Sequence, residues 1–408
     1  MDRPGGAFRR DAGPGRQPVI DVERARRETP GCAHVAHLNN AGSALPPAAV
    51  TDAVVGHLRL EERIGGYEAA DVAAPEVERA YTAIARLIGC APGEVAVVEN
   101  ATRAWDMAFY AFRFRPGDRI LTVRTEYASN VIALLQVASR TGSVVEVVET
   151  DEHGLPSLDH LARELERGAA LVAVTHVPTH SGLVNPAAEI GALARAAGVP
   201  YLLDACQSVG QLPVDVAGIG CDMLAATGRK FLRGPRGTGF LYVSERLVER
   251  LEPPFLDLHA ATWTAPGAYE IRPDARRFET WETNYAGKIG LGVAVDYALG
   301  WGLAAIEERV TALAERLRAQ LHEVPGVTVR DAGTRRCGIV TFTVDGVPAT
   351  EVSRRLRAAG INTSVSPMEY ARLDLAARGL PDLVRASVHY YNTEEELDRL
   401  CAALGRVS

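Results

Sequence analysis

The chain has 408 residues, of which 47% are hydrophobic and 23% are charged, and its formal net charge is −7. Its length allows a large and a small domain, and its composition is typical of a globular protein. The negative charge argues against a nucleic-acid partner or an anionic membrane surface, and no apolar run reaches the ~20 residues that span a bilayer. The six cysteines are scattered without zinc-type spacing, so we expect reduced thiols and a cytoplasmic protein.

Residues 1–20 are rich in Gly, Pro and Arg and contain no apolar segment of the kind found in secretory signals. We therefore predict a disordered leader over these residues. From about residue 70 to 245, β-branched runs alternate with helical periodicity, which predicts βαβ units and a mainly parallel sheet. The predicted strands are Val95–Val98, Arg119–Val123, Ser143–Val148, Leu171–His176, Val199–Leu203, Met223–Ala225 and Thr238–Val243. The predicted helices are Glu76–Leu87, Ala101–Phe112, Ala128–Ala138, Leu158–Glu166 and Pro186–Ala197.

The last of these strands follows its predecessor too closely for a helical crossover, so an antiparallel return is expected. A loop rich in Pro and aromatic residues, Pro253–Asn284, interrupts the pattern, and a long helix is predicted near Leu291–Gln320. A small α/β unit is predicted beyond it, from Gly326–Arg330, Cys337–Val344, Ala349–Ala359 (helix), Ile361–Val365, Ala386–His389 and a last helix from Thr393. We divide the chain into the leader (1–20), a large domain (21–295) and a small domain (296–408).

Lysine is almost absent from this chain. Only two of the 44 basic residues are lysines, Lys230 and Lys288. Arginine cannot replace lysine where a neutral primary amine must attack a carbonyl group. Lys230 follows the predicted strand Met223–Ala225, at a sheet edge where functional loops gather. An ordinary surface lysine is the alternative, but scarcity and position favour a Schiff base on Lys230.

Three further segments carry polar or aromatic groups at strand ends. Asp204 ends an apolar strand, and a buried carboxylate there requires a cation such as a pyridinium nitrogen. The junction Val97–Ala104 is a backbone site for a phosphate, or a plain turn with Asn100 or Thr102 as N-cap. Tyr127 places a flat ring at the sheet edge, or belongs to the core. Together with Lys230, these groups are the ones that a pyridoxal phosphate site requires.

The chain resembles the class V aminotransferase/cysteine desulfurase family of fold-type I pyridoxal-phosphate enzymes, from the segment 37–42 to the last helix. The most specific stretches are Leu202–Gln207, Thr227–Lys230 with Gly234–Gly239, and Val384–Ser387 with Tyr391–Thr393. The resemblance implies an α/β fold with a mainly parallel seven-stranded sheet in the large domain and a small α/β C-terminal domain. It also implies a homodimer with shared active sites that acts on a small amino-acid substrate.

The resemblance assigns roles to individual residues. Lys230 forms the Schiff base and acts as the catalytic base, Asp204 faces the pyridine nitrogen, and Tyr127 stacks on the ring where relatives carry His. The other implied cofactor-binding residues are Ala101, Thr102, Arg103, Thr179, Gln207, Thr227, Arg229, where relatives often carry His, and Tyr285, which would act across the dimer. Arg385 matches the residue that binds the substrate carboxylate, with Asn40 and Thr179 beside it; taken alone, Arg385 is equally a surface ion-pair residue.

The reaction is the least constrained part of the interpretation. Desulfurases of this family use a nucleophilic Cys on a small-domain loop. The matching residues, 361–374, contain no cysteine, and the positions of Cys337 and Cys401 do not allow either to replace it. This disfavours a persulfide-forming desulfurase and favours a C–S β-lyase acting on an S-substituted cysteine, in thiol metabolism or antibiotic biosynthesis. Decarboxylative oxidative deamination, transamination and epimerisation stay open. A nicotinamide dehydrogenase lacks support because no G-x-G-x-x-G follows the first strand, and a catalytically dead scaffold would tolerate loss of Lys230.

Overall fold

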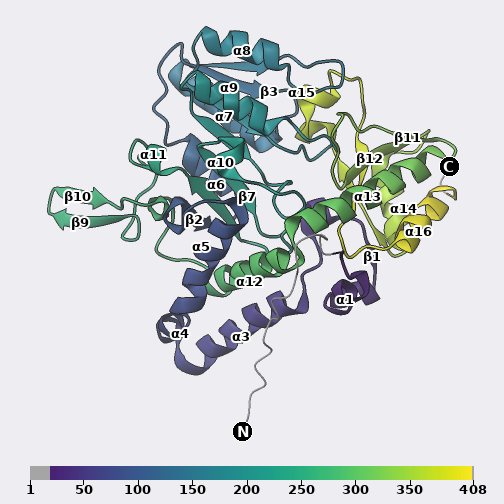
Figure 1. The fold of residues 1–408 in the computed structure, drawn as a ribbon, viewed down its shortest axis with the longest axis horizontal. Helices are drawn as coiled ribbons and strands as arrows, with labels where there is room; N and C mark the ends of the chain where they lie inside the picture. The colour runs from purple at the N-terminus through teal and green to yellow at the C-terminus, as the bar shows by residue number, and fades with distance from the viewer. Residues whose placement is uncertain (1–18, 407–408) are drawn as a thin grey trace.

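A seven-stranded sheet forms the centre of the computed structural model, which describes residues 19–406 (Figure 1). Most of the predicted leader lies outside these residues. The strand order is β2-β8-β7-β6-β5-β3-β4, and every neighbouring pair is parallel except those that β8 forms with β2 and β7. The strands are β2 (Val95–Val98), β3 (Arg119–Val123), β4 (Val144–Val148), β5 (Leu171–Thr175), β6 (Tyr201–Asp204), β7 (Met223–Thr227) and β8 (Gly239–Val243). The predicted mainly parallel sheet and the antiparallel return of its last strand are confirmed.

Helices cover both faces of this sheet, and its inner strands are accordingly rich in apolar residues. All residues of β2, β5, β6, β7 and β8 are buried, whereas the edge strand β4 is largely accessible. In α5, Ala80, Ile84 and Ile88 are buried at helical spacing and form the face turned to the core. The surrounding helices are α5 (Ala74–Ile88), α6 (Ala101–Phe109), α7 (Ala128–Thr141), α8 (Leu158–Glu166), α9 (Ala187–Ala196), α10 (Val216–Ile219) and α11 (Glu245–Val248).

The single long helix predicted near 291–320 is wrong. The structure has two helices, α12 (Tyr285–Trp301) and α13 (Leu303–His322), which meet at an angle of 79°. Gly302 joins them with a φ of 87°, a left-handed conformation that favours glycine, and this ends the first helix. As a result α12 packs against α3 and α5, while α13 runs on to the small sheet (Figure 1).

A four-stranded antiparallel sheet of order β11-β12-β15-β14 forms the predicted small α/β unit. Its strands are β11 (Val327–Val329), β12 (Ile339–Val344), β14 (Ser364–Ser366) and β15 (Leu383–Ser387), with helices α14 (Ala349–Ala358), α15 (Arg372–Leu375) and α16 (Glu394–Leu404) and the 3-10 turn η4 (Met368–Tyr370). Strand β1 (Ala36–His37) pairs in parallel with β13 (Ile361–Asn362), so the N-terminal segment lies against this unit. The domain boundary at residue 295 stays a prediction.

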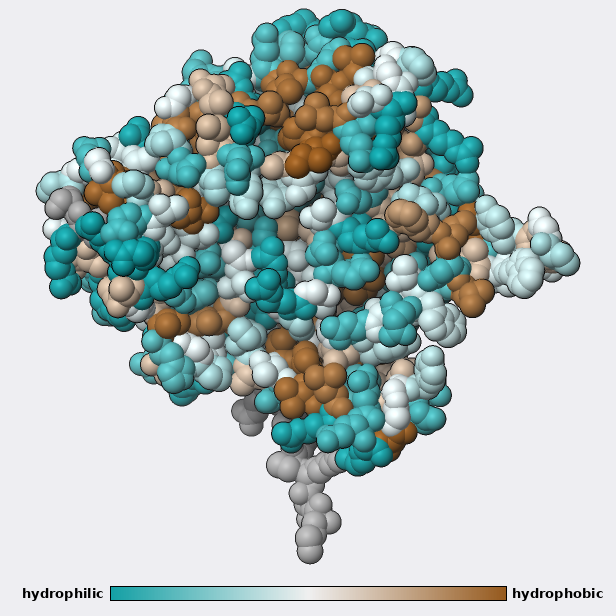
Figure 2. All heavy atoms as spheres, turned by 180° about the vertical axis from the view of Figure 1, so that it is seen from behind, coloured by the Kyte–Doolittle hydropathy of each residue, from teal (hydrophilic) through white to brown (hydrophobic). Residues whose placement is uncertain are grey.

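Several elements have no counterpart among the sequence predictions. They are α1 (Val22–Arg27), η1 (Pro30–Ala33), α2 (Asn40–Ser43), α3 (Ala48–Ile64), α4 (Gly66–Val72), η2 (Pro92–Glu94), η3 (Ala275–Phe278) and a hairpin of β9 (Ala261–Ala265) and β10 (Ala268–Ile271). The hairpin projects from the body of the molecule (Figure 1) and exposes Trp263 and Tyr269. Seen from behind, the surface is mainly hydrophilic with separate apolar patches (Figure 2). Within residues 19–406, no single helix has the length and apolar character of a membrane span.

Candidate active site

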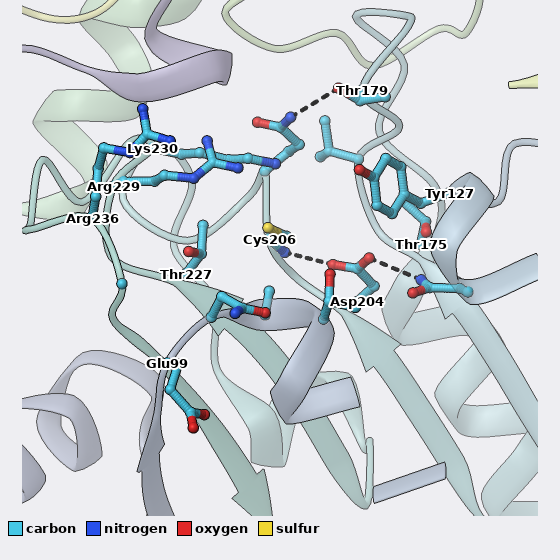
Figure 3. Close-up of a pocket in the computed structure, with 17 residues that line it drawn as sticks. Glu99, Tyr127, Thr175, Thr179, Asp204, Cys206, Thr227, Arg229, Lys230 and Arg236 are labelled. Atoms are coloured by element: carbon cyan, nitrogen blue, oxygen red, sulfur yellow. Dashed lines mark hydrogen bonds between the residues drawn. The ribbon is translucent and has the colours of Figure 1, made fainter. Parts of the chain in front are cut away.

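A cavity of about 500 Å³ lies where β5, β6 and β7 end and α6 and α7 begin (Figure 3). In parallel strands the carboxyl ends meet at one edge, which is where ligands of open α/β sheets bind. The residues predicted for the cofactor and found in the wall are Ala101, Thr102, Tyr127, Thr179, Asp204, Gln207, Thr227, Arg229 and Lys230. The wall also contains Glu99, Asn100, Asn130, Thr175, Val177, Cys206, Arg236 and Gly237. The structure therefore brings most of the predicted cofactor-binding residues together.

Lys230 extends into this cavity from a tight turn after β7. The turn is closed by hydrogen bonds from the Gly228 amide to the Thr238 carbonyl (2.9 Å) and from the Gly234 amide to the Gly228 carbonyl (2.8 Å). A Cβ atom on Gly228 would collide with the Thr238 hydroxyl, so glycine is required for this close approach. Burial lowers the pKa of Lys230, and within residues 19–406 no carboxylate lies at ion-pair distance from its Nζ. The amine is thus prepared to react as a neutral nucleophile.

Asp204 ends β6 and is 6% exposed. Its Oδ1 accepts a hydrogen bond from the Cys206 amide (2.9 Å), and its Oδ2 accepts one from Asn130 Nδ2 (3.0 Å). Burial raises the pKa of Asp204, although the hydrogen bond from the Cys206 amide and the nearby Lys230 oppose this. Burial and the charge of Asp204 also raise the pKa of the neighbouring Glu126 to about 7. A protonated pyridine nitrogen would stabilise the ionised form of Asp204.

Unpaired polar atoms show that the cavity suits a polar ligand. Gln207 donates from Nε2 to the Ala41 carbonyl and to Thr179 Oγ1, both at 3.2 Å, but its buried Oε1 has no partner. The buried Nε of Arg385 is also unpartnered. Such atoms cost free energy until a ligand or ordered water satisfies them. Pyridoxal phosphate, with its ring hydroxyl, pyridine nitrogen and phosphate, fits these groups.

The N-terminus of α6 lines one part of the cavity. Asn100 caps this helix by accepting a hydrogen bond from the Arg103 amide (2.9 Å). Strand β8 passes so near that a Cβ atom on Gly239 would lie 2.7 Å from the Asn100 carbonyl carbon. Arg229 and Arg236 line the same cavity, so backbone amides and cations converge, as phosphate binding requires. Arg103 faces a separate, smaller pocket, and its guanidinium lies 5.1 Å from the ring of Phe255.

Arg385 lies on β15 of the small sheet and contacts the cavity-wall residue Thr179. Its Nη1 donates to the Thr179 carbonyl (3.1 Å) and to the Thr179 hydroxyl, and its Nη2 donates to Asn39 Oδ1 (3.4 Å). Burial and the nearby charge of Arg229 lower the pKa of Arg385 to about 10. No carboxylate of the described chain pairs with this guanidinium, which leaves its charge available for a substrate carboxylate.

Four predicted residues lie outside the cavity wall: Arg103 and Arg385, described above, and Asn40 and Tyr285. Asn40 is fully buried, and its Nδ2 donates to the Ser387 carbonyl (2.7 Å) and to the His37 carbonyl (3.2 Å). These bonds fix the N-terminal segment to β15, and it is the preceding residue, Asn39, that contacts Arg385. Tyr285 begins α12, and its ring stacks at 6.4 Å on that of His57. Its contribution to a partner subunit stays a prediction.

Sequence reasoning missed four cavity residues that matter for the chemistry: Asn130, Thr175, Cys206 and Arg236. Arg236 is part of a segment that the family resemblance covers, but no role followed from its position. Cys206 comes two residues after Asp204, at a strand end that was already assigned to the site. This position in the sequence was therefore a usable signal for a thiol in the cavity.

Comparisons with known proteins agree with this geometry. The aminotransferase class-V family model matches residues 36–400. A probable cysteine desulfurase from Methanothermobacter thermautotrophicus is 30% identical over 397 residues, which cover 95% of this chain and 98% of that protein. The apo structure of a cysteine desulfurase from Thermococcus onnurineus NA1 has a TM-score of 0.89 at 27% identity, covering 94% of this chain and 97% of that chain. A C-DES mutant with glycine covalently linked to the pyridoxal-phosphate cofactor shares the fold, with a TM-score of 0.83 at 24% identity and coverages of 93% and 98%.

These comparisons correct the predicted reaction. The expectation of a C–S β-lyase, with a persulfide-forming cysteine desulfurase disfavoured, is wrong, because relatives that match nearly the whole chain are named cysteine desulfurases. The alternatives of decarboxylative deamination, transamination and epimerisation gain no support from these relatives. A thiol can also enter the cavity from the large sheet, so a loop without cysteine does not exclude desulfuration.

The family match, the fold and the chemistry of the cavity lead to one conclusion. This chain belongs to the class V aminotransferase family of pyridoxal-phosphate-dependent enzymes.

Proposed function

We propose that the protein is a pyridoxal-phosphate-dependent enzyme that removes sulfur from cysteine and leaves alanine. The observation that carries the proposal is the cavity itself, where the amine of Lys230 and the buried carboxylate of Asp204 face one space and the unpaired guanidinium of Arg385 contacts Thr179 in its wall. The names of the relatives, which are cysteine desulfurases over nearly the full length of the chain, favour this reaction over others of the family.

The bound cofactor supplies an electron sink for bonds at Cα and Cβ of the amino acid. Asp204 would face the pyridine nitrogen with a negative charge, and the N-terminus of α6 would hold the phosphate together with Arg229 and Arg236. Tyr127 supplies an aromatic face beside the ring. Lys230 is the covalent anchor and, as a neutral amine, accepts a proton from Cα and returns one to the product.

Arg385 orients the substrate through its α-carboxylate. A guanidinium provides two parallel N–H donors, so it fixes the direction of the amino acid as well as binding it. Thr179 contacts both Arg385 and Gln207, and therefore links the substrate end of the cavity to the cofactor end.

We also propose that the enzyme is a homodimer and that Tyr285 acts in the partner's site. Apolar side chains exposed on α3, α4 and the β9–β10 hairpin support this, among them Leu58, Tyr67 and Trp263. Mixing the Lys230→Ala and Tyr285→Ala variants tests it, because shared sites would restore activity in the mixed dimer. A monomer in solution would contradict the proposal.

The reaction is tested by incubating the cofactor-loaded enzyme with L-cysteine and a thiol reductant, and by measuring alanine, sulfide and pyruvate. We expect alanine and sulfide in equal amounts, and no product from the Lys230→Ala variant. Pyruvate in place of alanine, or no turnover of cysteine by enzyme that binds the cofactor, would overturn the proposal.

A further inference from the structure

We propose that Cys206 is the sulfur acceptor of this enzyme and carries a persulfide during turnover; this inference rests on the proposed desulfuration. All six cysteines are free thiols in the structure. Of these, only Cys206 lines the cavity that contains Lys230. Cys337 is fully buried in a separate apolar cluster, and Cys401 lies on α16 of the small domain.

The backbone fixes the direction of the Cys206 side chain. Its amide donates to Asp204 Oδ1 at 2.9 Å, which ties the residue to the end of β6. Figure 3 shows the sulfur atom between Asp204 and the side chains that enter from the Lys230 side. The thiol and the Lys230 amine line the same cavity, so a nucleophile and a proton acceptor face one space.

A second feature of the cavity points to a ligand beside this thiol. Gln207, the next residue, is 3% exposed, and its Oε1 has no hydrogen-bond partner. Arg385, which is 7% exposed, keeps its Nε unpartnered and its positive charge unpaired. A polar atom and a cation that are both left unsatisfied indicate a space built for a polar, carboxylate-bearing molecule. Cys206 therefore borders the space that the cofactor and the amino acid would occupy.

The transfer needs no oxidant. Burial raises the pKa of the Cys206 thiol, so the thiol proton must have a local acceptor. Lys230 Nζ takes this proton, and the thiolate attacks Sγ of the substrate cysteine. An S–S bond forms while the Cβ–Sγ bond breaks, and its electron pair remains on Cβ. Cβ then takes a proton from the Lys230 ammonium, so that cysteine and a thiol become alanine and a persulfide.

This assignment explains why the small-domain loop can lack a cysteine. Residues 361–374 contain no thiol, whereas Cys206 is held on the rigid end of a central strand. A thiol in this position acts within the cavity and requires no movement of the loop. A reductant or an acceptor thiol must enter the cavity to release the sulfur.

The test identifies the residue that carries the sulfur. The cofactor-loaded enzyme is incubated with ³⁴S-cysteine without reductant, alkylated, digested and analysed by mass spectrometry. We expect one additional ³⁴S atom on the Cys206 peptide. The Cys206→Ala and Cys206→Ser variants should keep the cofactor absorbance, which shows that they fold, but form alanine on the order of 100-fold more slowly. Cys90→Ser and Cys401→Ser serve as matched controls and should keep the label on Cys206.

The outcomes separate the two proposals. If the wild type forms alanine while the label appears on another cysteine or only as free sulfide, the role of Cys206 is overturned and the desulfuration stands. Full activity of both Cys206 variants would likewise overturn the role of Cys206 and leave the desulfuration standing. If the wild type forms no alanine, the proposed reaction fails, and the inference fails with it.

Discussion

Arg385, on strand β15 of the small sheet, donates from Nη1 to the carbonyl oxygen of Thr179, 3.1 Å away on the loop that follows β5 of the large sheet. Through this contact the small domain reaches the cavity. Only 7% of Arg385 is exposed, yet its guanidinium makes no ion pair within residues 19–406. A buried, unpaired cation is costly, which is consistent with a site that awaits a carboxylate.

For Arg385→Lys we therefore expect weaker binding of the amino acid. An ammonium offers no bidentate geometry, so KM for the substrate should rise by about 10²-fold, while the cofactor absorbance stays unchanged. Steady-state kinetics measure the change, and Arg354→Lys on the surface is the control. An unaltered KM would show that another group holds the carboxylate.

Lys230→Ala should remove the covalent attachment of the cofactor. The purified wild-type protein is expected to be yellow, with an absorbance band at about 420 nm, because the Schiff base extends the conjugation of the ring. Borohydride reduction followed by peptide mapping should place the cofactor on Lys230. If the Lys230→Ala variant keeps both the absorbance band and the borohydride adduct, the Schiff base is formed by another residue, and Lys288 is the next candidate.

Asp204→Asn should slow the reaction without unfolding the protein. The amide preserves the shape and can accept one of the two hydrogen bonds, from Asn130 or from the Cys206 amide, but it supplies no charge for the pyridine nitrogen. We expect kcat to fall by about 10²-fold or more, with partial recovery in Asp204→Glu. Equal kcat in the Asn variant and the wild type would mean that the electron sink does not depend on this carboxylate.

Glu126 should make the stability of the cofactor-free protein depend on pH. Its pKa rises from the usual 4.5 to about 7 on folding, because it is buried beside Asp204. Between pH 4.5 and about 7, the folded state binds more protons at Glu126 than the unfolded state does. The contribution of Glu126 to the free energy of unfolding is therefore complete below pH 4.5 and is lost as the pH rises to about 7. Glu126→Gln should remove that decline, by on the order of 3 kcal/mol across the window. Urea unfolding of both proteins at several pH values measures the difference, and parallel curves would refute it.

Lys288 should be a structural lysine. Its Nζ lies 3.0 Å from the Tyr81 hydroxyl and 3.4 Å from Glu279 Oε2, and it is 4% exposed. Lys288→Met leaves the buried carboxylate of Glu279 without its cation, so we expect a loss of about 3–5 kcal/mol in the free energy of unfolding.

Replacing Glu279 by Gln in the same chain should recover part of the stability lost in Lys288→Met, which a double-mutant cycle detects. Additive effects of the two substitutions would show that the pair is not coupled.

The sequence predicted the central sheet well, for a clear physical reason. Its inner strands are buried on both faces, so they appear as short apolar runs, and the predicted strand ends lie within two residues of the observed ones. The direction of β8 followed from the short connection after Lys230. The cavity followed too, because the carboxyl ends of parallel strands meet at one edge.

Other features of the structure could not be predicted from the sequence pattern. The apolar periodicity continues across Gly302, so the bend between α12 and α13 depends on a backbone angle that the pattern does not encode. Asn39 and Asn40 are adjacent, and only the structure shows that the first contacts Arg385 while the second anchors the chain. The division of labour between Lys230 and Lys288 depends on contacts between residues far apart in the sequence.

The groups that would hold the cofactor come from the large sheet and its helices, whereas the guanidinium that would select the amino acid comes from β15. The electronic and the selective tasks are thus carried on separate pieces of the chain. Descendants of such a gene can drift toward new substrates by altering the smaller piece alone, while the machinery that activates them is inherited intact.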